Sequence, residues 1–122
     1  MGKRVMVVDD SASLRQVVSI ALRGAGYEVT EAVDGADALA KLRGERVNLV
    51  ICDVNMPVMD GITFVSEVKK RPEYRFLPVL MLTTESRESR KEDGQRAGAK
   101  AWMVKPFRPE QILNAVSKLI AV

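Results

Sequence analysis

Short apolar runs alternate along the chain with segments whose apolar residues recur at helical spacing. The apolar runs have the length of strands and are found at residues 4–8, 27–32, 49–52, 79–82 and 101–104. Helical spacing is found at residues 14–21, 38–42, 61–68 and 112–120. The pattern therefore predicts five strands that alternate with helices.

The segment after the fourth apolar run, residues 86–98, departs from this pattern. It reads SRESRKEDGQRAG, contains no large apolar residue and carries Gly94 in its interior, where glycine costs about 1 kcal/mol relative to alanine. A helix of this composition has little to anchor it to a core. Two interpretations stay open: a solvated surface helix, or an element left loose so that it can move.

Alternation of strands and helices indicates parallel pairing through right-handed crossovers, which puts helices on both faces of the sheet. The run Val5-Met6-Val7-Val8 is apolar at consecutive positions, as suits a central strand buried on both faces. We therefore expect a single α/β domain over residues 1–122. Its doubly wound, five-stranded parallel sheet has the order 2-1-3-4-5 and a flavodoxin-like (βα)5 topology.

Composition narrows the function classes. The 19 basic and 16 acidic residues are mixed along the chain and give a net charge of +3, without a basic arm or an aromatic-basic stripe, so nucleic-acid binding is not expected. The apolar run after the first residues is too short for a signal peptide or a membrane span, so we expect a cytoplasmic protein. The single cysteine, Cys52, is interpreted as a small buried hydrophobe.

The chain contains no histidine. This excludes Ser-His-Asp and Cys-His catalysis and makes a zinc site unpromising. Chemistry has to come from carboxylates, lysines and hydroxyls.

Polar residues follow the predicted strands where the strands end. Asp9 and Asp10 follow the first strand and Asp53 follows the third. The carboxyl ends of parallel strands share one edge, and ligands bind there at the point where the strand order reverses. Carboxylates crowded together repel one another, and an oxygen-rich site of this kind suits Mg²⁺. The backbone carbonyl of Asn55 is a further candidate ligand.

Thr83 and Lys105 follow the fourth and fifth strands and supply a hydroxyl and a compact positive charge at the same edge. A tetrahedral dianion fits between a metal ion and this lysine, which indicates phosphoryl transfer with a carboxylate as nucleophile. Plainer roles compete. Asp10, Ser11 or Ser13 could cap the first helix and Asp60 the third, and Thr83 could end its strand by propensity alone.

Five motifs resemble those of response-regulator receiver domains. They are VVDDS at 7–11, EAVDGADAL at 31–39, ICDVNMPVMDG at 51–61, PVLMLTTES at 78–86 and GAKAWMVKPF at 98–107. The likeness runs over residues 3–120 and is greatest to the stand-alone chemotaxis regulators of that family.

The resemblance implies that Asp53 accepts a phosphoryl group from a phosphohistidine on a histidine kinase. It implies Mg²⁺ held by Asp9, Asp10, Asp53 and the Asn55 carbonyl. Lys105 would then pair with the phosphoryl group. Water later hydrolyses the acyl phosphate, so the only chemistry implied is phosphorylation and dephosphorylation of the domain itself, without an enzyme's turnover of other substrates.

Further features of the family map onto the second half of the chain. Thr83 would swing toward the phosphoryl group, Asn55 and Glu85 would tune the rate of reset, and the Lys105–Pro106 bond would be cis. Two positions depart from the commonest pattern. Trp102 stands where tyrosine or phenylalanine is usual, and its larger ring is not expected to turn fully inward. Thr84 replaces a smaller residue and narrows access to the phosphoryl group.

The last helix uses the residues that follow Pro106, so we expect a monomeric, stand-alone regulator whose output is a binding surface. That surface would comprise residues 86–98, the strand with Trp102 and the final helix. The implied partners are a histidine kinase, a target such as the flagellar motor switch and in some systems a phosphatase, with neither nucleic acid nor membrane among them.

Other functions remain to be separated from this one. A phosphate sink or relay member would share the same site, and a phosphorylation-independent interaction module would share only the fold. A Mg²⁺-dependent phosphatase typically has a second aspartate two residues after its nucleophile, where this chain has Asn55. A flavin or nucleotide binder lacks support, since no glycine-rich loop follows the first strand.

Overall fold

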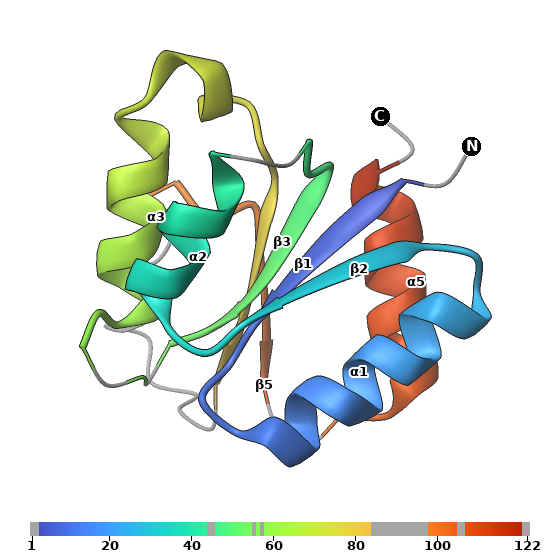
Figure 1. Cartoon of the computed structure of the whole chain (residues 1–122). Coiled ribbons are helices and arrows are strands. Elements are labelled where there is room, and N and C mark those ends of the chain that lie inside the picture. The colour runs from blue at the N-terminus through green and yellow to red at the C-terminus, as the bar shows by residue number, and fades with distance from the viewer. Residues whose placement is uncertain are drawn as a thin grey trace.

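The computed structural model describes residues 3–43, 46–54, 56, 58–83, 98–104 and 107–120. Its centre is a parallel sheet of five strands in the order β2-β1-β3-β4-β5 (Figure 1). The strands are β1 (Arg4–Val8), β2 (Glu28–Ala32), β3 (Leu49–Asp53), β4 (Val79–Thr83) and β5 (Ala101–Val104). The predicted fold class and strand order are confirmed.

Helices cover both faces of the sheet. In Figure 1, α1 (Ala12–Gly24) and α5 (Pro109–Ile120) lie on one face, and α2 (Gly35–Leu42) and α3 (Gly61–Lys69) lie on the other. A short 3-10 helix, η1 (Pro72–Tyr74), precedes β4. The helix expected over 86–98 lies almost wholly outside the described residues. Within the described part of the chain, no helix is both long and apolar enough to span a membrane.

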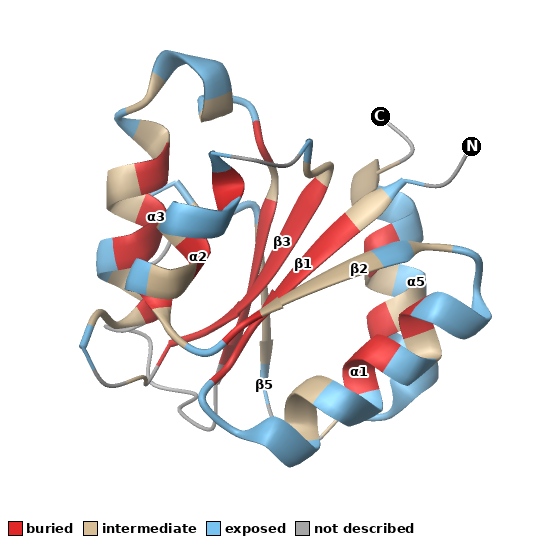
Figure 2. Cartoon of the chain, viewed as in Figure 1, coloured by how far each residue is buried: buried red, intermediate tan, exposed pale blue. Residues whose placement is uncertain are grey.

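The core is divided by the sheet into two layers. Successive side chains of a strand point to opposite faces, so Val5 and Val7 pack toward α1 and α5 while Met6 and Val8 pack toward α2 and α3. Strands β1 and β3 are buried along almost their whole length (Figure 2). This explains why their sequences are apolar at consecutive positions instead of alternating.

Three of the helices that begin at the carboxyl edge of the sheet have a side-chain cap. The Leu14 amide donates to Ser11 Oγ (3.3 Å) at the start of α1. The Asp37 amide donates to Asp34 Oδ1 (2.8 Å) in α2, and the Thr63 amide to Asp60 Oδ1 (2.8 Å) in α3. Each cap is worth about 1 kcal/mol. Among the candidates for the first helix, Ser11 is therefore the cap, and Asp60 caps the third.

Candidate functional site

The carboxyl edge of the sheet brings together Asp9, Asp10 and Asp53. One carboxylate oxygen from each lies within 4.8 Å of the others. Asp9 is 2% exposed and Asp53 is 6% exposed, whereas Asp10 faces solvent. The cluster, called the acidic pit below, thus has two buried carboxylates and a third that faces solvent.

Asp53 lies within a strand, whereas the sequence pattern ended that strand one residue earlier, at Cys52. It is the last residue of β3 and pairs with Leu82 of β4. The amide of Val54 continues the ladder by donating to the Leu82 carbonyl (3.0 Å). Because β3 is flanked by strands on both sides, the backbone that carries this carboxylate is held firmly.

The loop between β1 and α1 fixes Asp9. Its amide donates to the Ala32 carbonyl of β2 (3.1 Å), and its Oδ1 accepts from the Ser11 amide (2.8 Å). Arg15, on the first turn of α1, donates to the Asp9 backbone carbonyl (2.6 Å) and to Glu31 of β2 (3.3 Å). Arg15 thereby ties the loop to both neighbouring elements. Sequence reasoning missed this residue. Its position four residues after Ser11 was the available signal, because residues four apart lie on the same face of a helix and Arg15 therefore faces the loop before α1.

Gly61, the first residue of α3, packs directly against the site. A Cβ at this position would lie 2.2 Å from the Asp53 carbonyl oxygen, and the Gly61 amide donates to the Val54 carbonyl (2.8 Å). No other residue type fits so close to another backbone. The sequence marked Gly61 only as a helix start, because a contact with Asp53 cannot be read from local spacing.

Cys52 precedes Asp53 and is fully buried. Burial raises the pKa of its thiol well above the ordinary value, and the nearby Asp53 and Asp9 carboxylates raise it further. The thiol therefore stays protonated, and it donates to the Asp53 carbonyl (3.3 Å). Since the thiolate is the reactive form, Cys52 is an inert core residue, as its place in an apolar run indicated.

The donor set of this pit suits a hard divalent cation. All three side chains offer carboxylate oxygens, and Mg²⁺ is typically bound through one or two carboxylates with water and phosphate oxygens completing the shell. Two of the carboxylates are buried, where like charges repel most strongly. An ion at this position would offset that repulsion.

Most of the remaining predicted site residues lie outside the part of the chain that the structure describes. Thr83 is the last residue of β4, paired with Val104 of β5, which brings its backbone to the same edge as Asp53. Outside the described residues lie Asn55, Thr84, Glu85, Lys105 and Pro106. The proposed lysine side of the site and the expected cis bond therefore stay predictions.

Trp102 is the aromatic residue that the sequence singled out on β5. It pairs with Met81 of β4 and is half-buried, with its side chain packed against the core layer under α2 and α3. Because β5 is an edge strand of the sheet, this agrees with an aromatic ring that covers the sheet edge without entering the core.

Comparisons with known proteins agree with this geometry. Residues 5–117 match the family model of the response regulator receiver domain. The chain is 36% identical to the chemotaxis protein CheY of Bacillus subtilis, covering 98% of this chain and 99% of that one. It is 48% identical to the solved structure of the chemotaxis protein CheY4 of Vibrio cholerae, with a TM-score of 0.94 and coverage of 98% and 99%.

Longer regulators share the same domain. The alkaline phosphatase synthesis transcriptional regulatory protein PhoP of Bacillus subtilis is 38% identical over 98% of this chain, which spans only 49% of PhoP. The chain therefore matches about half the length of that relative. The fold, the acidic pit and the matched residues together establish that this chain belongs to the response regulator receiver domain family.

Proposed function

We propose that this receiver domain is a phosphoacceptor switch in which Asp53 takes a phosphoryl group from a phosphohistidine of a histidine kinase. The observation that carries the proposal is the pit itself. Asp53 ends a central strand, nearly buried, with a carboxylate oxygen within 4.8 Å of those of Asp9 and Asp10. A nucleophile held this firmly beside a metal-binding pair meets the main demand of phosphoryl transfer, which is positioning.

The chemistry follows from the groups present. A carboxylate oxygen of Asp53 attacks phosphorus in line with the leaving nitrogen, the P–N bond breaks, and the departing imidazole takes a proton from solvent. Asp9, Asp10 and Asp53 would hold the cation, with the Asn55 carbonyl proposed as a further ligand. When bound, Mg²⁺ supplies the positive charge that offsets the phosphoryl oxygens. Cys52 stays protonated and does not compete as nucleophile.

The remaining roles come from the family resemblance. Lys105 is proposed to pair with the phosphoryl group and Thr83 to swing toward it, while Asn55 and Glu85 set how quickly water restores Asp53. The altered state is proposed to be read on β5, α5 and residues 86–98, with Thr84 and Trp102 influencing the switch. In this scheme phosphorylation shifts a pre-existing equilibrium toward a state that a target protein prefers.

Likeness to chemotaxis proteins supports a chemotaxis role, with a cytoplasmic histidine kinase as donor and the flagellar motor switch as target. A phosphate sink or relay receiver would use the same acidic pit. It would differ from a motor regulator in lacking a target such as the motor switch. The single-domain arrangement over residues 1–122 stays a prediction.

Phosphoryl uptake tests the proposal directly. Phosphoramidate is a suitable donor because it carries the same P–N bond as phosphohistidine. With Mg²⁺ present, intact mass spectrometry should show one added phosphoryl group on the wild type and none on Asp53→Asn. Asp34→Asn is the matched control, since Asp34 caps α2 and asparagine caps a helix equally well. Normal uptake by Asp53→Asn would show that the acceptor is another residue, and no uptake by the wild type would favour a phosphorylation-independent module.

A further inference from the structure

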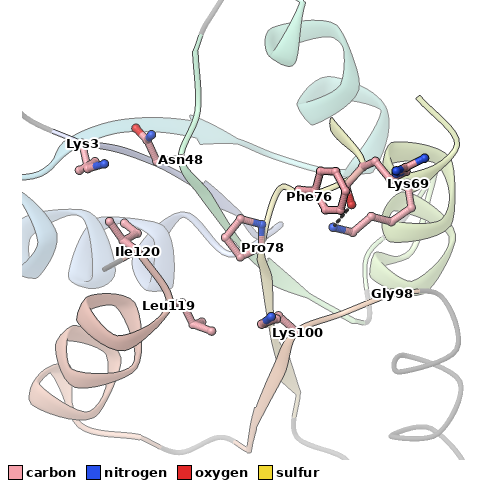
Figure 3. A pocket seen from close by; sticks show the side chains of 10 residues that line it. Lys3, Asn48, Lys69, Phe76, Pro78, Gly98, Lys100, Leu119 and Ile120 are labelled. Atoms are coloured by element: carbon pink, nitrogen blue, oxygen red, sulfur yellow. Dashed lines mark hydrogen bonds between the residues drawn. The ribbon is translucent and has the colours of Figure 1, made fainter. Parts of the chain in front are cut away.

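A second concave site lies at the opposite edge of the sheet, where the strands begin. It is a groove of about 710 Å³, a size typical of ligand sites. Four segments each bring one cation to it: Lys3 before β1, Lys69 at the end of α3, Arg75 after η1 and Lys100 before β5. Figure 3 labels the three lysines.

The positive charge of this groove is not balanced from within. No acidic residue is among the described residues that line it, and none of the four cations has a carboxylate partner in the described part of the chain. Burial lowers the pKa of the Lys69 amine, and the nearby Lys100 ammonium lowers it further. An anionic occupant would relieve this repulsion, since an opposite charge favours the charged form of each amine.

The arrangement of the cations argues against a compact anion. Lys69 is already engaged, because its amine donates to the backbone carbonyls of Arg75 and Leu77. Its methylenes lie against Gly98, where an added Cβ would come within 2.9 Å of them. Figure 3 shows Lys3 at one end of the groove and Lys69 at the other, with Lys100 between them. Negative charges spaced along an extended chain match this spread better than one phosphate does.

The groove also offers apolar surface. Phe76 is 83% exposed, although an aromatic ring gains most from burial. The Arg75 guanidinium lies 4.8 Å from the centre of the Phe76 ring. Pro78 lies in the middle of the groove, and Leu119 and Ile120 of α5 lie on the side toward Lys3, away from Phe76 (Figure 3). An occupant therefore needs an apolar side chain beside its negative charges.

We propose that this groove docks an acidic peptide segment of a partner protein, anchored by an apolar side chain against Phe76. A concave groove does not fit a flat membrane, and a single-stranded nucleic acid stacks successive bases on several aromatic rings, whereas Phe76 is the one aromatic residue among the described residues that line the groove. The groove lies across the sheet from Asp53. Docking is therefore independent of phosphorylation and leaves the acidic pit open to the kinase.

A labelled peptide tests the proposal. The probe is a twelve-residue synthetic peptide of alternating aspartate and leucine with a fluorescent label, titrated with the full chain. Binding should be seen by fluorescence anisotropy, and amide chemical-shift changes should gather at Lys69, Arg75, Phe76 and Lys100. Asp53→Asn should bind equally well, so a failure of the phosphoacceptor proposal would not affect this result.

Charge and apolar contact are separated by variants. Arg75→Glu with Lys100→Glu should weaken binding at least tenfold, and Phe76→Ser should weaken it several-fold; all three residues are exposed, and circular dichroism checks their folding. Lys70→Glu is the matched control, because Lys70 is a neighbouring cation that pairs with Glu67 and does not line the groove. The affinity of this variant for the peptide should change less than twofold.

Several outcomes would overturn the proposal. They are the absence of peptide binding, equal loss in Lys70→Glu, and chemical-shift changes that map to another face. Tighter binding of a single-stranded oligonucleotide or of anionic lipid vesicles through the same residues would also overturn it, because the natural occupant would then not be a peptide.

Discussion

The two edges of one sheet carry opposite charges and are built in opposite ways. At the carboxyl edge, Asp9, Asp10 and Asp53 converge until their oxygens lie within 4.8 Å of one another. At the amino edge, Lys3, Arg75 and Lys100 line a groove around Lys69 without converging on one point. Convergent carboxylates suit a single small cation, whereas dispersed ammonium and guanidinium groups suit an extended anion.

The net charge of +3 conceals this separation. Basic and acidic residues are mixed along the sequence, but parallel strands send the residue before each strand to one edge and the residue after it to the other. Lys3 and Asp9 flank the same strand and lie at opposite edges. The electrostatic character of each edge is therefore a product of topology, and whole-chain charge predicts neither edge.

The largest expected effect concerns how tightly each edge is packed. Alanine substitution of one glycine at each edge allows the two edges to be compared. At the carboxyl edge a Cβ on Gly61 would meet the Asp53 backbone at 2.2 Å, which cannot yield cheaply. Gly61→Ala should lower the free energy of unfolding by about 3 kcal/mol, measured by urea denaturation. At the amino edge Gly98 has φ +112° but meets only the flexible Lys69 side chain, so Gly98→Ala should cost about 1 to 2 kcal/mol.

Gly24→Ala is the control for these two variants. Gly24 ends α1, has open space around its Cα and lacks a positive φ, so alanine there should stabilise the protein by about 0.5 kcal/mol. If Gly61→Ala were tolerated as well as Gly24→Ala, the close packing of α3 against Asp53 would not be what holds the acidic edge.

The sequence predicted the sheet better than either edge in detail. Apolar runs at Arg4–Val8 and Leu49–Asp53 are strong signals, and parallel pairing then requires Asp9 and Asp53 to end near each other. The choice of Ser11 as cap was not predictable, since Asp10 and Ser13 are equally good by type and only the backbone conformation decides.

Other features depend on contacts between distant segments. The close approach of Gly61 to Asp53 requires the start of α3 to lie against the end of β3. The cations of the basic groove come from four segments, and the two farthest apart in the sequence are Lys3 and Lys100. No local sequence pattern marks such a set, because each of these lysines taken alone looks like an ordinary surface residue.

A smaller effect should distinguish the acidic edge from the basic edge, namely the change in the free energy of unfolding when Mg²⁺ is added. Without Mg²⁺, Asp53→Asn should raise the free energy of unfolding by about 1 kcal/mol, because it removes one charge from a crowded set. Mg²⁺ at ten times its Kd should stabilise the wild type by about 1.4 kcal/mol and the variant much less. Thermal melts with and without the ion measure both.

Asp37→Asn provides the control for that experiment. Asp37 pairs with Lys41 (3.2 Å) and lies outside the acidic pit, so its response to Mg²⁺ should equal that of the wild type. Equal stabilisation of Asp53→Asn by the ion would contradict a cation site at this edge.

The smallest expected effect concerns the basic edge. The pKa of Lys69 lies below its ordinary value of 10.5 because of burial and the Lys100 charge. Lys100→Gln should raise this pKa toward the ordinary value, whereas Lys70→Gln should leave it unchanged. NMR titration of the lysine Cε resonances measures it; an unchanged pKa in Lys100→Gln would show that the two ammonium groups do not interact.

The lowered pKa also gives a pH dependence of stability. Between the folded pKa of Lys69 and 10.5, the unfolded chain binds more protons at this group than the folded chain does. The contribution of Lys69 to the free energy of unfolding therefore rises with pH across that window. Lys69→Met should remove this rise, which urea denaturation at a series of pH values would detect.

The central claim is that the acidic edge places one carboxylate, that of Asp53, where a phosphoryl group is received. Its most direct test is to phosphorylate the wild type with phosphoramidate and Mg²⁺, trap the acyl phosphate by borohydride reduction, and locate the modified residue by tandem mass spectrometry. The account predicts a single modified residue, Asp53. Modification at Asp9 or Asp10 instead, or uptake that is unchanged when Mg²⁺ is removed by chelation, would contradict it.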